Sequence, residues 1–247
     1  MRLLRWNRRR NMTNIIDLAY AGRTLKYLIP YIPVTLSLAI VSMVAGCILG
    51  LAVMVVRWKK IPVLSQLGTV YVVVGRAVPT LIILYVVFFA FPVFLMVMNH
   101  GIIPQEFNSI PALFFAMVGL SLHAGAYLAE IFRAAVNSVP KGQMEAALSI
   151  GMTWPQAFRR IVLPQAAVMA LPLMGNQFLG LIKGSSIAFM ITVMELFGAA
   201  NYLSGISERY IEIYLALALL YWGISLFFEG VFHKAETHLA VYKGSKA

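Results

Sequence analysis

The stretch Glu145–Pro164, EAALSIGMTWPQAFRRIVLP, carries charges and turn signals in a chain that is otherwise strongly apolar. Thr153, Pro155 and Gln156 form the pattern of a helix start: threonine caps the helix, proline lies in its first turn, and glutamine completes a capping box. Gly151 permits a turn just before this helix. The following apolar residues recur at helical spacing and predict one apolar face: Trp154, Ala157, Phe158, Ile161 and Val162.

Upstream of this turn, Pro140 opens a second short helix. One face of that helix holds Met144, Ala147 and Leu148. We therefore expect residues 140–164 to form a small two-helix loop with an apolar face and two adjacent arginines, Arg159 and Arg160. The residues alone leave two interpretations about equally favoured: a helix lying in the lipid headgroup layer, or a docking element for a soluble partner.

The composition outside this loop is that of a membrane protein. Hydrophobic residues make up 61% of the 247 residues, charged residues make up 12%, and the mean hydropathy is +0.83. A soluble domain usually carries about 25% charged residues. Repeated β-barrel alternation is absent, so the chain is expected to be an all-α polytopic membrane protein with about five transmembrane helices. The expected spans are Tyr31–Val56, Ala77–Gln105 (core Ala77–Met98, kinked at Pro79 and Pro92), Ile110–Ile131, Leu163–Ile182 and Ile211–Phe228.

Between the last two spans, Gly184–Met194 is too short to cross a membrane and is expected to be re-entrant or interfacial. The predicted organisation is an N-terminal tail and interfacial segment (1–30), a transmembrane domain (31–232) that contains the 140–164 loop, and a cytoplasmic tail (233–247). No repeat with a period of 20 to 50 residues is found.

The distribution of lysine and arginine sets the orientation. Basic residues gather after the first span, around the 140–164 loop and in the C-terminal tail, which predicts an outside N-terminus and a cytoplasmic C-terminus. Residues 1–26 do not fit this orientation. They contain seven lysines and arginines, and the predicted orientation would place them outside. Either translation starts at Met12, or the tail is an exception to the rule.

The chain lacks the residues of an enzyme. It has no G-x-x-x-x-G-K-[ST] motif, so it is not expected to hydrolyse ATP itself. The four histidines do not cluster at metal-ligand spacing, and His123, inside a span, is expected to have a hydrogen-bonded packing role. The net charge of +11 is attributed to basic loops on the cytoplasmic side of the membrane, next to lipid. Nucleic-acid binding is not expected, because the sequence has no basic patch interleaved with aromatic residues. The single Cys47 cannot form an intrachain disulfide.

The pattern E-A-A, three residues, G, nine residues, I-x-L-P resembles the signature loop of permease subunits of bacterial ATP-binding-cassette importers. The segment Ala126–Ala147, AYLAEIFRAAVNSVPKGQMEAA, is similar to the polar amino acid subfamily. The resemblance implies the type I importer permease fold, in which the loop is a coupling element. The implied coupling residues are Glu145, Ala146, Ala147, Gly151, Trp154, Ala157, Phe158, Arg159, Arg160, Ile161 and Pro164.

The resemblance also implies partners. They are an ATPase dimer that holds ATP and Mg, a second permease copy, identical or not, and an extracytoplasmic amino-acid-binding protein, all serving import across the bacterial inner membrane. No cofactor or metal is expected in this chain. The rival interpretation is a self-sufficient secondary transporter or a channel subunit. Such proteins often contain two related halves, which five spans do not provide.

The end of the fourth span is similar to the subfamily text N-x-F-I-x-L-x-K-D-[ST]-S, which implies a role in the transport path. The implied path residues are Asn176, Gln177, Gly180, Lys183, Gly184, Ser185 and Ser186. Gly184 replaces the usual acid, and Gln177 stands where an acid is common. Loss of these negative charges favours a neutral zwitterion such as cystine over a cationic amino acid.

Three ionisable residues are candidates for a role at membrane depth, where charges are costly. Glu130 is expected to pair with Arg133 one turn away. Lys183 either snorkels to the outer interface or contacts cargo. Glu195 is expected at the outer interface.

Overall fold

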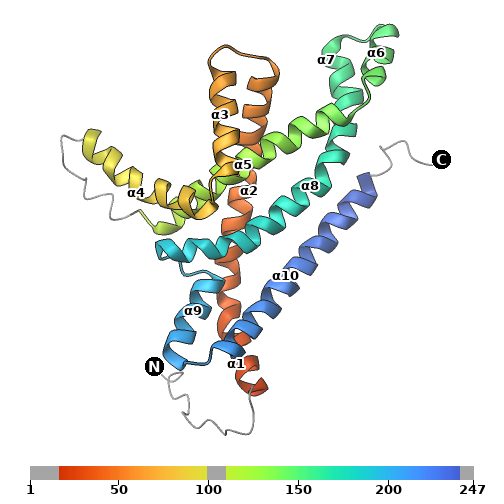
Figure 1. Cartoon of the computed structure of the whole chain (residues 1–247). Helices are drawn as coiled ribbons and strands as arrows, with labels where there is room; N and C mark the ends of the chain where they lie inside the picture. The colour runs from red at the N-terminus through yellow and green to blue at the C-terminus, as the bar shows by residue number, and fades with distance from the viewer. Residues whose placement is uncertain (1–16, 99–109, 240–247) are drawn as a thin grey trace.

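The computed structural model describes residues 17–98 and 110–239, and that part of the chain is helical without strands (Figure 1). Within it, five helical segments are long and apolar enough to cross a membrane, which confirms the all-α class and the number of spans. They are Leu18–Trp58, Thr80–Met98, Ala112–Ser138, Trp154–Ile191 and Tyr210–Leu239.

The described residues form a series of helices. In chain order they are α1 (Leu18–Leu28), a 3-10 turn (Ile29–Tyr31), α2 (Ile32–Trp58), α3 (Leu64–Ala77), α4 (Thr80–Met98), α5 (Ala112–Ser138), α6 (Lys141–Ser149), α7 (Trp154–Ala157), a π turn (Phe158–Val162), α8 (Leu163–Gly184), a 3-10 helix (Ser185–Ile191), α9 (Leu196–Ser207) and α10 (Tyr210–Leu239).

Two helices were missed by the sequence prediction. α3 is too short to span a membrane, and its buried residues are Gly68, Val72 and Gly75. The predicted kink at Pro79 is wrong, because Pro79 lies between α3 and α4; Pro92 does lie inside α4. α9 follows the segment predicted as re-entrant, which forms the 3-10 helix.

The last span is longer than predicted. α10 continues to Leu239, so the tail expected from residue 233 begins as helix. The Lys- and Arg-free loop expected outside after Met98 lies largely outside the described residues, in 99–109.

The core of the fold is α5, which packs against α2, α3, α4 and α8. Small residues let α2 approach it closely. A Cβ atom on Gly50 would lie 2.9 Å from the backbone nitrogen of Ala129, and one on Gly46 would lie 2.9 Å from the Cβ atom of Ala124. Small residues at such crossings are typical of helix packing in membranes, where van der Waals contact replaces the hydrophobic effect as the driving force.

A buried carboxylate ties α9 to two other helices. Glu195 caps α9 by accepting from the backbone N–H of Gly198 at 2.8 Å, and it accepts hydroxyl hydrogen bonds from Thr35 of α2 at 3.2 Å and Tyr221 of α10 at 3.1 Å. Its side chain has no exposed surface and is enclosed by protein, and its expected place at the level of the outer interface stays a prediction. Burial raises the pKa of the Glu195 carboxyl, and these hydrogen bonds oppose that shift.

The molecule has two distinct ends (Figure 1). α6 and α7 lie at one end, toward which the α2–α3 turn and the C-terminal end of α10 also point, while α1 and α9 lie at the opposite end. At that opposite end Arg209, the residue before α10, pairs with Asp17, the N-cap of α1, at 3.2 Å. The hydrogen bond from the backbone N–H of Tyr20 lowers the pKa of Asp17. The basic residues Arg23 and Lys26 of α1 therefore lie away from the loop end.

Replacing Gly50 with alanine should push α2 away from α5, because the new Cβ atom would meet the backbone of α5. Overpacking of this kind costs about 1–3 kcal/mol. Gly223→Ala in α10 is the matched control, since a Cβ atom there meets nothing within 4 Å. Thermal unfolding of the detergent-purified protein should show a lower midpoint for Gly50→Ala and an equal or higher one for Gly223→Ala. Equal midpoints for the two variants would contradict the described α2–α5 contact.

Candidate functional site

The loop between α5 and α8 has the predicted two-helix form. α6 ends at Ser149, and Gly151 turns the chain with a positive φ of 85°, a conformation that glycine adopts without strain. The backbone N–H of Thr153 donates to Oε1 of Gln156 at 2.9 Å, which is the glutamine half of the predicted capping box. The local sequence signals thus determine both the turn and the start of α7.

The second helix of the loop runs into the next span without a break. α7, the π turn Phe158–Val162 and α8 follow one another directly, and α8 begins at Leu163 with Pro164 in its first turn, as predicted. A proline inside a regular α-helix clashes with the carbonyl of the residue four positions earlier. The wider π turn, in which the Leu163 N–H bonds to the Phe158 carbonyl, comes just before Pro164 and accommodates it.

Part of the predicted docking face packs against other residues of the same chain. Ala157 has no exposed surface, and Ala147 of α6 is also buried. The rings of Trp154 and Phe158 stack 5.2 Å apart, and Trp58 at the end of α2 packs against both, at 5.6 and 5.1 Å. Ala157 therefore cannot itself contact a partner, and a bulky acid at that position would disturb the fold.

An exposed apolar patch remains at the tip of the loop. Ile150 is 76% exposed, Trp154 48% and Leu148 41%. Sequence reasoning missed Ile150, whose place next to the Gly151 turn is the signal that could have found it. The other predicted coupling residues are divided: Glu145, Ala146, Arg159 and Arg160 are exposed, and Ile161 and Pro164 are half-buried.

The predicted path residues also divide between two faces of α8. Asn176, Gly180 and Lys183 are exposed at positions i, i+4 and i+7, so they share one face. A Cβ atom on Gly180 or Gly184 would meet nothing within 4 Å. No ion pair or hydrogen bond of the Lys183 side chain is found in the described part of the chain.

The remaining path residues do not lie on this open face. Gln177 is half-buried. Ser185 is fully buried and donates to the carbonyl of Ile182 at 2.8 Å, while Ser186, half-buried, donates to the carbonyl of Lys183 at 2.8 Å. Both hydroxyls therefore close the 3-10 turn.

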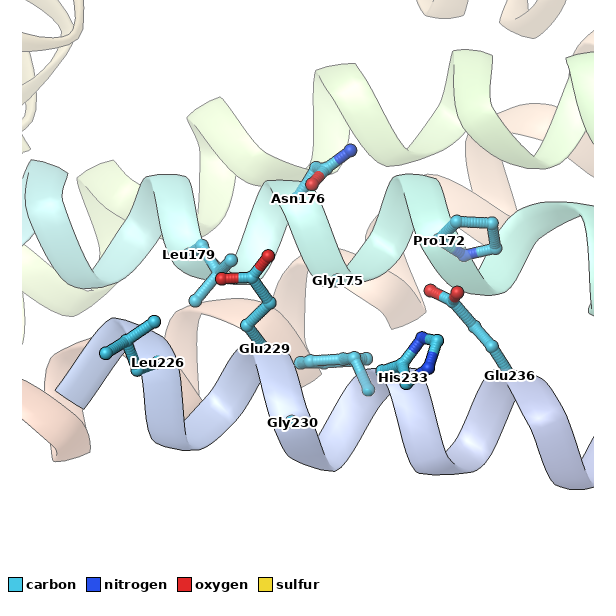
Figure 2. A pocket seen from close by; sticks show the side chains of 10 residues that line it. Pro172, Gly175, Asn176, Leu179, Leu226, Glu229, Gly230, His233 and Glu236 are labelled. Atoms are coloured by element: carbon cyan, nitrogen blue, oxygen red, sulfur yellow. The ribbon is translucent and has the colours of Figure 1, made fainter. Parts of the chain in front are cut away.

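A groove of about 500 Å³ runs between α8 and α10 beside Asn176. Figure 2 shows the carboxylates of Glu229 and Glu236 pointing from α10 toward α8, with His233 between them along the helix. The sequence prediction missed these acids because it ended the last span at Phe228. Their spacing of i, i+4 and i+7 places them on one helix face and was the available signal.

Other ionisable residues predicted in the spans have protein partners. Glu130 pairs with Arg133, as expected, at 2.6 Å, and also with Arg57 of α2 at 2.5 Å. Nε2 of His123 lies 3.2 Å from the hydroxyl of Thr80, in agreement with a packing role. Arg76, at the end of α3, was missed; its guanidinium lies 5.6 Å from the ring centre of Tyr127.

Across residues 17–98 and 110–239 no group of three or more His, Cys, Asp or Glu side chains could hold a metal ion. The arrangement instead joins an exposed apolar patch to a helix with an open polar face.

Known proteins resemble this chain in sequence and in fold. The probable amino-acid permease protein YxeN of Bacillus subtilis (strain 168) is 43% identical over 87% of this chain and 92% of its own length. The L-cystine transport system permease protein TcyL of the same organism is 38% identical over 92% of this chain and 93% of its own. A crystal structure of an amino acid ABC transporter with histidines has a TM-score of 0.78 at 28% identity and covers 91% of this chain and 100% of that one.

The family described as the binding-protein-dependent transport system inner membrane component matches residues 43–237. Several apolar spans and these relatives agree on a multi-pass protein of the inner membrane. The chain belongs to this family, among the permeases of amino-acid ABC transporters.

Proposed function

We propose that this chain forms half of the transport path of an ATP-driven amino acid importer and that its Leu148–Trp154 tip docks on an ATPase subunit. The unbroken helical run from Trp154 through α8 carries the proposal. Because α8 also presents Asn176 and Lys183 on an open face, a displacement of the tip would reach the path directly. ATP and Mg would be held by the ATPase, which the family implies as a partner together with a substrate-binding protein.

The proposed orientation places the loop end in the cytoplasm. Arg57, Lys60, Arg133 and Arg159 belong to segments at or next to this end, as the positive-inside rule requires. α1 and α9 then face the outside, where an extracytoplasmic binding protein would deliver cargo.

A second permease copy would complete the path. The exposed face of α8 combines Leu173, which is 44% exposed, with Asn176, Gly180 and Lys183. A face of mixed polarity is poorly matched to lipid tails and well matched to a shared, partly hydrated path. We therefore propose a dimer, identical or mixed, with this face turned toward the second copy.

The proposed cargo is a neutral zwitterionic amino acid such as cystine. Lys183 has no acceptor among the described residues, so it is available for a cargo carboxylate. The relative TcyL, named as an L-cystine permease, shares 38% of its sequence with this chain. The groove at Glu229 and Glu236 favours a second candidate, a cationic amino acid, because it supplies negative charge that the α8 sequence lacks.

Replacing Ile150 with aspartate should release the ATPase, because a charged group would enter an interface that needs an apolar side chain. Losing the burial of one isoleucine costs about 1.5–3 kcal/mol, which weakens binding about ten- to a hundredfold. The measurement is the amount of ATPase that co-purifies with the permease.

Ile206→Asp is the matched control for this variant. Ile206 is 51% exposed on α9, at the opposite end of the molecule, and it should keep its ATPase. If the complex with Ile150→Asp survives purification and ATP-driven uptake stays normal, the tip is not the coupling element.

Replacing Lys183 with methionine should weaken binding of cystine by the purified permease complex. A charge-assisted hydrogen bond contributes about 1.5–3 kcal/mol, so affinity should fall about ten- to a hundredfold. Lys234→Met, an exposed lysine of α10, is the control and should bind normally. Gly184→Asp should shift preference toward cationic amino acids, since its position has room for the side chain.

Two results would argue against this cargo assignment. Parent-like affinity in Lys183→Met would show that this lysine lies outside the binding site. Tighter binding of arginine than of cystine by the parent complex would favour the cationic candidate and the Glu229 groove.

A further inference from the structure

A second groove, of about 380 Å³, lies near the loop end between α2, α3 and α5. It differs from the α8–α10 groove in charge, because three of its lining residues are basic. Its lining residues are Met54, Arg57, Trp58, Lys60, Ser65, Thr69, Arg133, Val136 and Asn137.

The charge of this groove is only partly balanced. Glu130 accepts hydrogen bonds from both arginines. Nη1 of Arg57 donates to Oε1 at 2.5 Å. Nε and Nη2 of Arg133 donate to Oε2 at 2.9 and 2.6 Å, so part of each guanidinium stays unpaired by Glu130. Lys60 has no acceptor in the described part of the chain. Three cations and one carboxylate leave two positive charges, and Ser65 and Asn137 add a hydroxyl and an amide. Such donors are the groups that bind a phosphodiester.

The helix that lines this groove also exposes an apolar surface. Val73 shares one face of α3 with Ser65 and Thr69, at spacing i, i+4 and i+8, and is 61% exposed; Leu67 (59%) and Val70 (58%) are exposed on other faces of this helix. Most of α3 is exposed in the same way, because only its two glycines and Val72 are buried. A soluble anion would leave this apolar surface exposed, whereas the acyl chains of a lipid would cover it.

We propose that this groove binds the headgroup of an anionic phospholipid from the leaflet on the loop side, with its phosphodiester at Lys60 and the free edges of the arginines and its chains along α3. Basic pockets between transmembrane helices at the cytoplasmic face suit such headgroups. Trp58 borders the groove and also packs against Trp154 and Phe158. Trp58 alone therefore separates the bound lipid from the aromatic residues of the coupling loop. This assignment does not depend on the cargo.

The test compares Lys60→Gln with Lys59→Gln, which makes the same charge change at a neighbouring exposed lysine that does not line the groove. The full transporter complex is incorporated into nanodiscs of phosphatidylglycerol and phosphatidylcholine, released and examined by native mass spectrometry. The parent and Lys59→Gln should retain phosphatidylglycerol in preference to phosphatidylcholine. Lys60→Gln should retain it about fivefold less, which corresponds to about 1 kcal/mol for one basic residue.

Two outcomes would overturn the proposal. Equal retention by Lys59→Gln and Lys60→Gln would show general attraction to a basic surface rather than a site. Displacement of the lipid by millimolar inorganic phosphate would show a site for free anions. Co-purification of the ATPase is measured on the same samples, so failure of the lipid site is distinguishable from failure of the proposed coupling.

Discussion

The close approach of α2 and α5 is the constraint on which the rest of the structure depends. Gly46 and Gly50 leave no room for a side chain between the two helices, so the crossing is set at backbone contact. α3, α4 and α8 then pack on the remaining faces of α5. Because lipid tails are as apolar as leucine, this fit, and not the exclusion of water, holds the helices together.

This crossing also positions the 140–164 loop, the proposed coupling element. α2 ends at Trp58, whose ring lies against Trp154 and Phe158, and α5 ends just before α6. The loop is therefore supported from both helices of the central pair, while its tip, with Ile150, stays exposed. From the tip the chain enters α8 through a π turn without a break. Support at its base and a continuous helix into α8 are the two properties that the proposed coupling role requires.

The sequence predicted the elements whose signals are local. Long apolar runs defined the five spans, and Thr153, Gln156 and Gly151 defined the start and the turn of the loop helix. It missed α3 and α9, because both are too short to read as spans and their apolar residues face outward or against other helices. It misjudged Ala157, since helical spacing shows that residues share a face but not which neighbour covers it.

The ionisable residues illustrate the same limit. Glu130 and Arg133 are one turn apart, so their pairing followed from spacing, whereas the contact with Arg57 joins residues 73 apart in the chain. The hydrogen bonds of Glu195 to Thr35 and Tyr221 also join distant residues, 160 and 26 positions apart in the chain. The acids of the α8–α10 groove were hidden because the last helix was predicted to end too early. Contacts between distant segments depend on packing that a single sequence does not display.

In the proposed function, the 140–164 loop and α8 move as one body. The most direct test of this motion uses spin labels at Gln156, exposed on α7, and Leu173, exposed on α8, both in one permease copy of the purified complex. The distance between these labels should be the same without ATP and in the complex trapped with ADP and vanadate. In a second sample, the distance between Leu173 labels on the two copies should change. A change of the Gln156–Leu173 distance within one copy would contradict the account.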